Sequence, residues 1–291
     1  MAERLNAEIA SRLGEVAELL QEQGANRFRV DAYYRAARLL RNLREPVSEI
    51  IRRDGIEALR DLKGIGDSLA RSIHTLATTG RLPMLERLRG ESDPVALLAT
   101  VPGIGKVLAE RIHDDLGIDS LEELESASHD GRLVEALGEK RLAGIRDSLA
   151  ARLGRIRRGA TIPPAPESPI GELLDVDREY FQKAAKGVLP KIAPRRFNPT
   201  HQAWLPVLHT QRGQRHYTAL YSNTGLAHRM EKTQDWLVLY YDGGNGERQY
   251  TIVTEPKGPL KGKRVVRGRE AECENYYESC LEDQLVCPYG D

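Results

Sequence analysis

The sequence predicts a multidomain protein in which an all-α N-terminal domain is followed by an α+β domain with an antiparallel sheet. Apolar residues recur at helical spacing up to about residue 157. The proline-rich stretch 159–169 then interrupts this pattern, as a stiff linker does. Beyond it, short runs rich in Val, Leu, Tyr and Thr alternate with Gly, Asn and Asp clusters, which is typical of strands and turns. We therefore expect a helical domain at 1–158, a linker at 159–169 and an α+β domain at 170–291.

Composition limits the classes of function. The 43 basic residues balance the 43 acidic ones, which argues against a protein that coats nucleic acid through its overall charge, but not against local contacts. The first residues lack the apolar core of a signal peptide, and no run of about 18 apolar residues occurs, so we expect no membrane partner. Three cysteines, Cys273, Cys280 and Cys287, form no disulfide framework. A cytoplasmic location fits these features best.

Helix signals divide the N-terminal domain into short segments. Asn6 caps a first amphipathic helix that Gly24 ends, and Pro46 closes a second helix near 30–43. Further helices are expected at 47–52, 56–61, 68–78, 95–99, 106–116, 133–137 and 140–153. The domain is therefore predicted to be helical throughout.

A twelve-residue segment occurs twice in this domain. Residues 62–73 and 101–112 share an apolar residue, a Gly-Ile-Gly turn and an apolar helical pattern, displaced by 39 positions. Glycines allow positive φ and close approach of another backbone, and the helix behind each turn presents free N–H groups to a phosphate. We interpret the segments as helix-hairpin-helix units that bind a DNA backbone without recognising its bases. The predicted contact residues are Lys63, Gly64, Ile65, Gly66 and Ser68 in the first unit, and Gly103, Ile104, Gly105 and Lys106 in the second.

The second domain shows alternating rather than helical periodicity. Strands are expected at 203–209, 216–221, 236–241, 249–254 and 264–266, with helices at 172–186 and 270–281. The cluster Asp242-Gly243-Gly244-Asn245-Gly246 is a hairpin turn signal between the third and fourth strands. No motif in this domain fixes a function.

The N-terminal domain resembles a known family over roughly half of the chain. The segment Phe28-Arg29-Val30-Asp31-Ala32-Tyr33-Tyr34 precedes both Gly-Ile-Gly units, and residues 79–82, 85–88, 116–118 and 121–124 continue the match. Residues 6–157 are similar in this respect to the N-terminal part of the family X, or DNA polymerase beta-like, DNA polymerases. This array is far more specific than a single Gly-x-Gly turn.

The resemblance implies several site residues. It places the contacts to a 5′-phosphate at Arg29, Tyr33, Arg60 and Ser68, and it implies a monovalent cation held by backbone carbonyls. Those carbonyls would belong to Arg60, Leu62 and Ile65 in the first unit and to Ala99, Val101 and Ile104 in the second.

Catalysis is not the expected outcome of this resemblance. The family's 5′-deoxyribose-phosphate lyase forms an imine through a lysine, but the matching position is Ser72, whose hydroxyl cannot do so. Residual lyase chemistry would need another amine, for which Lys63 in the turn is the candidate. The polymerase palm is also missing, because no Gly-Ser motif precedes Asp175-Val176-Asp177 and too few residues follow the linker. Polymerase activity is therefore not expected.

One alternative makes the second domain an enzyme. Asp235, Glu255 and Lys257 resemble the PD-(D/E)xK nuclease pattern, in which two carboxylates hold Mg²⁺ and a lysine steadies the attacking water. Pro256 and Gly258 around the Glu-x-Lys part indicate a strand exit and a turn instead. Mg²⁺ is required only if this alternative holds.

Together these observations favour a non-sequence-specific DNA-binding protein of DNA repair. It would bind duplex, gapped or nicked DNA near 5′-phosphates through the tandem units, with no required cofactor. The second domain would add a surface for DNA or for a repair protein. A metal-dependent nuclease and a residual lyase remain the alternatives.

Overall fold

The computed structural model describes residues 2–91, 93–116, 118, 121, 124, 127–128, 133–157, 167–242 and 247–282. Its first helical unit begins with two long helices, α1 (Ala2–Glu22) and α2 (Arg27–Asn42), which pack along each other. Asn26 caps α2 by accepting a hydrogen bond from the backbone N–H of Phe28. Four shorter helices follow: α3 (Val47–Asp54), α4 (Glu57–Arg60), α5 (Asp67–Thr79) and α6 (Pro83–Leu88). The inward faces of helices α1 to α6 form one hydrophobic cluster, whose last residue in the sequence is Leu88.

The second helical unit is smaller. It contains α7 (Pro94–Leu98), α8 (Lys106–Leu116), α10 (Val134–Leu137) and α11 (Glu139–Arg157). Asp93 caps α7 through the N–H of Ala96. Residues from Val95 to Leu149 build a separate cluster, so the two helical units do not share a core among the described residues.

The sheet unit contains six antiparallel strands in sequential order. They are β1 (Lys191–Ile192), β2 (Leu205–Arg212), β3 (Arg215–Tyr221), β4 (Leu237–Asp242), β5 (Glu247–Thr254) and β6 (Arg264–Val266). Helix α12 (Ile170–Ala185) packs on β2, β3 and β6, and α14 (Glu270–Glu282) contacts β6 and α12. The short helix α13 (Gly225–Arg229) follows β3. The predicted fold class, a helical N-terminal region followed by an α+β region with an antiparallel sheet, is confirmed.

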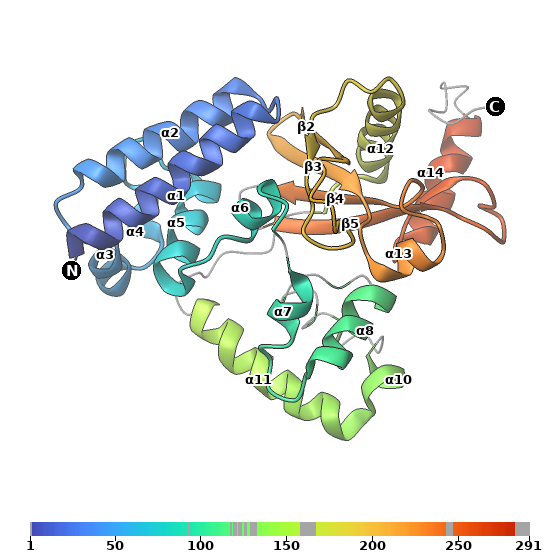
Figure 1. Cartoon of the computed structure of the whole chain (residues 1–291), viewed down its shortest axis with the longest axis horizontal. Coiled ribbons are helices and arrows are strands. Elements are labelled where there is room, and N and C mark those ends of the chain that lie inside the picture. Colours follow the sequence, from blue (N-terminus) through green and yellow to red (C-terminus); the bar gives the residue numbers. More distant parts are fainter. Residues whose placement is uncertain are drawn as a thin grey trace.

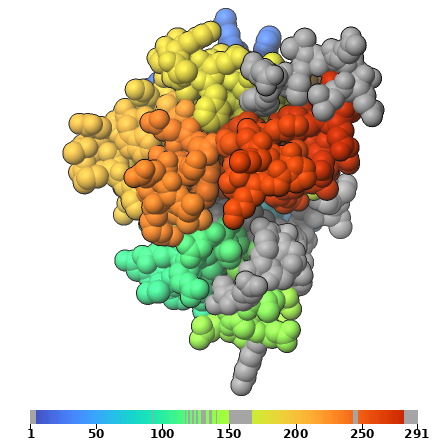
Figure 2. Space-filling view, turned by 90° about the vertical axis from the view of Figure 1, so that its right-hand side faces the viewer, coloured from blue at the N-terminus to red at the C-terminus, as the bar shows by residue number. Residues whose placement is uncertain are grey.

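The two helical units lie next to the sheet unit. Figure 1 shows the first helical unit on one side of the strands and the second helical unit below them. The space-filling view in Figure 2 shows the sheet unit, in orange and red, above the green second helical unit. The predicted linker lies outside the described residues up to position 166, and the domain boundaries at 158 and 170 stay predictions.

Two further sequence expectations can be followed in the structure. Cys273 is fully buried and Cys280 is partly exposed, both as free thiols, whereas Cys287 lies outside the described residues. Within the described chain, we find no helix that combines the length and the hydropathy needed to span a membrane.

Candidate nucleic-acid interface

The two Gly-Ile-Gly turns adopt the same backbone geometry. Gly64 has φ of 90° and Gly103 has φ of 89°, values that favour glycine. The N–H of Ile65 donates to the carbonyl of Leu62 at 3.0 Å, and that of Ile104 donates to Val101 at 2.9 Å. Each isoleucine is buried and holds its turn to the core beneath. The sequence repeat is therefore also a structural repeat.

The glycine edge of both turns is open. A Cβ added at Gly64, Gly66 or Gly105 would meet no atom within 4 Å, and at Gly103 it would meet only Ile145, at 3.6 Å. All four glycines are exposed. No side chain therefore occupies the space directly beside Gly64, Gly66 or Gly105.

Backbone donors point out of these open edges. The carbonyls of Gly66 and Gly105 accept the first helical hydrogen bonds, from Ala70 and Ala109, both at 2.9 Å. The N–H groups of the three residues between each glycine and that alanine have no i−4 acceptor within the helix, and no side chain caps α5. Exposed Lys63 and Lys106 stand beside the turns. This arrangement suits one backbone phosphate at each turn.

Three other predicted contact residues lie together beneath the sheet unit. Arg29 is 9% exposed and Tyr33 is 3% exposed, and both stand close to Ser68 at the start of α5. Ser68 donates a hydrogen bond from its Oγ to the carboxylate of Asp242 at the end of β4, and Nη2 of Arg29 lies 4.0 Å from the same carboxylate. Burial, and to a smaller extent the charge of Asp242, raise the pKa of Tyr33. The structure gathers the three residues but covers them with a strand end, which sequence reasoning did not foresee.

The remaining residues implied by the resemblance have local partners. Nε of Arg60 lies 2.7 Å from the carboxylate of Asp67 and the side chain is about one-third exposed, so Arg60 stays at the edge of the first turn. The carbonyls of Leu62 and Val101 each accept one hydrogen bond from the isoleucine of their turn. A carbonyl oxygen has a second lone pair, and the monovalent cation stays a prediction.

A polar seam joins the first helical unit to the sheet unit. Glu247 forms an ion pair with Arg87, whose guanidinium carbon lies 3.7 Å from the centroid of the Tyr240 ring. Nε2 of His209 lies 3.0 Å from Oε1 of Gln23. Burial, followed by the charges of Arg29 and Arg87, lowers the pKa of His209 to about 3, so this imidazole is neutral at pH 7.

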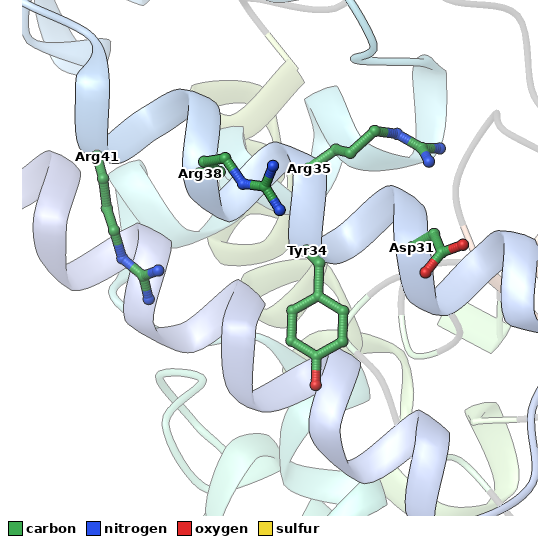
Figure 3. A pocket seen from close by; sticks show the side chains of 5 residues that line it. All are labelled: Asp31, Tyr34, Arg35, Arg38 and Arg41. Carbon is green, nitrogen blue, oxygen red and sulfur yellow. The ribbon is translucent and has the colours of Figure 1, made fainter.

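Helix α2 turns a second basic surface to solvent. Arg35, Arg38 and Arg41 are exposed and, with Asp31 and Tyr34, line a hollow of about 360 Å³. Figure 3 shows the three guanidinium groups spread along the helix. Within the described part of the chain none of the three arginines forms an ion pair. Asp31, the acid that lines the same hollow, is paired with Arg27. We call these three arginines the α2 stripe; it was not predicted from the sequence.

The residues of the nuclease alternative are held by other contacts. Oδ1 of Asp235 accepts hydrogen bonds from Thr254 Oγ1 at 2.6 Å and from Arg264 Nη1 at 2.7 Å. Glu255 lies outside β5 and is paired with Arg267 at 2.6 Å, which lowers the pKa of its carboxyl. Lys257 lies in the exposed loop that follows. Across the described ranges no group of three or more His, Cys, Asp or Glu side chains could hold a metal ion.

Comparison with protein families agrees with the repeated turn geometry. Residues 4–82 match the family model of a helix-hairpin-helix domain, and residues 95–151 match that of a SAM-like helix-hairpin-helix tandem. The first match contains Gly64 and the second contains Gly103. The N-terminal half is therefore a helix-hairpin-helix region of the kind that binds DNA without sequence specificity.

Proposed function

We propose that this protein binds the sugar-phosphate backbone of DNA through its two hairpin turns and acts in DNA repair, at gaps, nicks or 5′-phosphates. The observation that carries the proposal is the duplicated turn. Both glycine turns are exposed and have φ near 90°, each precedes a helix N-terminus, and a lysine accompanies each; for α5 no side chain caps that end. Two such sites bind two backbone phosphates and leave the base edges untouched.

The α2 stripe belongs to the same proposal as a further phosphate-contacting surface. Guanidinium groups hydrogen-bond phosphate oxygens well, and those of the stripe are not neutralised by described acids. A chain with no net charge can bind DNA in this way because its basic groups are concentrated locally. The monovalent cation at the turn carbonyls remains part of the proposal and is not required for backbone contact.

Nuclease or lyase activity is not favoured. Asp235 and Glu255 are each paired with an arginine, and Ser72 donates its hydroxyl to the carbonyl of Ser68 at 3.0 Å. The two carboxylates are not a free pair for a metal ion, and the Ser72 hydroxyl is not an amine, so a lyase would depend on the exposed Lys63.

A fluorescence-anisotropy titration tests the proposal. The whole protein is titrated onto a labelled duplex and onto a 5′-phosphorylated one-nucleotide gap, at low and moderate salt. Binding to both, steeply weakened by salt, supports backbone contact, and tighter binding to the gap supports the repair role. Absence of binding to either DNA at low salt refutes the proposal.

A further inference from the structure

The end of the β4–β5 hairpin places two carboxylates against the first helical unit. Asp242 is the last residue of β4, and Glu247, its antiparallel partner, is the first residue of β5. Asp242 accepts the hydroxyl of Ser68 and lies 4.0 Å from Arg29. Glu247 is paired with Arg87. Two acids from one hairpin thus pair with two arginines that are both less than a tenth exposed.

These contacts reach the edge of the first Gly-Ile-Gly turn. Ser68 is the second residue of α5, two positions after Gly66, so its hydroxyl belongs to the helix N-terminus that would face a bound phosphate. A carboxylate and a phosphate accept hydrogen bonds from the same donors. A DNA strand on this edge would bring its negative charge next to Asp242, and like charges repel. A phosphate bound at this edge would therefore lie close to the carboxylate of Asp242, and their repulsion would weaken its binding.

The seam around these acids is polar. Each hydrophobic cluster of the described residues stays within the first helical unit, the second helical unit or the sheet unit. Side-chain hydrogen bonds supplement the ion pairs, as between Asn26 and Gln211 at 2.8 Å. An interface without a shared apolar core resembles a transient contact, and its ion pairs weaken with salt. Separation of the two surfaces therefore divides none of these hydrophobic clusters.

We propose that Asp242 and Glu247 form a built-in competitor, so that docking of the sheet unit and DNA binding at the first turn exclude each other. This inference rests on the proposed function. The glycine edges of both turns are open, but the position that Ser68 holds in the first unit is held in the second by the exposed Val107, which has no hydroxyl to bind an acid. The docked protein therefore binds DNA through the second turn, and the undocked protein binds it through both turns.

Removing the two acids tests the competition. The variant Asp242→Asn/Glu247→Gln is titrated onto labelled duplex beside Glu270→Gln/Glu272→Gln, which neutralises two exposed, arginine-paired acids of α14. The first variant is expected to bind roughly fivefold more tightly than the control or better, as typical coupling between two sites predicts. An equal gain in both variants shows a plain charge effect and overturns the competitor, as does no gain in either. If neither the wild type nor either variant binds duplex, the proposed function itself is refuted.

A reversible cross-link tests docking directly. Cysteines replace Asn26 and Gln211, Cys280 and Cys287 become serine, and a short reducible cross-linker joins the new pair. Circular dichroism verifies folding before DNA is added. The competitor predicts weaker duplex binding while the link is intact, and recovery after reduction. Equal affinity before and after reduction overturns the competitor while leaving the proposed function intact.

Discussion

At the residue scale, the positive φ of Gly64 and Gly103 makes both positions sensitive to any side chain. We expect Gly64→Val/Gly103→Val to weaken duplex binding about tenfold or more for every base sequence, because a lost hydrogen bond to a charged group costs roughly 1.5–3 kcal/mol. Anisotropy titrations on two unrelated duplexes measure this effect. Gly80→Val is the matched control, since Gly80 has φ of 69° and open space but caps the far end of α5. Equal losses in both variants would show that misfolding, rather than contact, is being measured.

His209 gives the protein a pH dependence of stability. Its pKa is about 3 in the folded chain, whereas an unfolded histidine titrates near 6.5. The unfolded chain therefore takes up this proton first, so the contribution of His209 is complete above pH 6.5 and is lost as the pH falls toward 3. We expect the urea midpoint to fall between pH 7.5 and 5, and His209→Gln to flatten this fall. The same substitution at the exposed His201 serves as the control.

The hairpin residues were predictable because their chemistry is local. A Gly-Ile-Gly turn followed by a helix is determined by neighbours in the chain, and the structure gives Gly64 and Gly103 the positive φ expected of them. The environment of Arg29 was not predictable in this way. Its anionic neighbour, Asp242, is more than 200 positions away in the sequence, and no periodic pattern connects the two.

At the element scale, the α2 stripe should add to the salt dependence of DNA binding. Each phosphate contact contributes about 0.9 to the slope of log K against log salt, so Arg35→Gln/Arg38→Gln/Arg41→Gln is expected to reduce that slope by up to about 2.7. Titrations between 50 and 200 mM salt, a range in which such contacts are readily resolved, measure it. Arg52→Gln/Arg53→Gln removes exposed arginines that already pair with Glu49, Glu45 and Asp54. If the slope changes equally in this control variant, the α2 stripe is not part of the DNA interface.

Element boundaries followed from periodicity where the elements are long. The predicted strands at 236–241 and 249–254 differ by no more than two residues from β4 and β5, since both runs are rich in Val, Leu, Tyr and Thr and a Gly-Asn cluster separates them. The two-residue β1 and the five-residue α13 were missed. Segments so short contain little more than one hydrophobic period, which is too little for a pattern to be recognised, so their tertiary contacts define them.

At the scale of the whole molecule, Gly90 connects the first helical unit to the start of the sheet. Its carbonyl accepts the N–H of Arg195 at 2.8 Å, and a Cβ at this position would stand 2.4 Å from the carbonyl oxygen of Ala193. We expect Gly90→Ala to lower the urea midpoint clearly more than Gly187→Ala. Gly187 also has positive φ, 65°, but has open space around it, so its substitution adds only backbone strain of about 1–3 kcal/mol. Equal midpoints for the two variants would contradict the close approach.

The polar seam has a kinetic and stoichiometric consequence because both surfaces belong to one chain. A competitor on the same polypeptide is never diluted, because its docking is an intramolecular step. Free DNA must overcome this internal partner at every encounter, whatever the amount of protein present. A DNA strand that is already bound at the second turn raises the local concentration of DNA beside the first turn. Occupancy of the first turn then depends on this local concentration rather than on the bulk concentration of DNA.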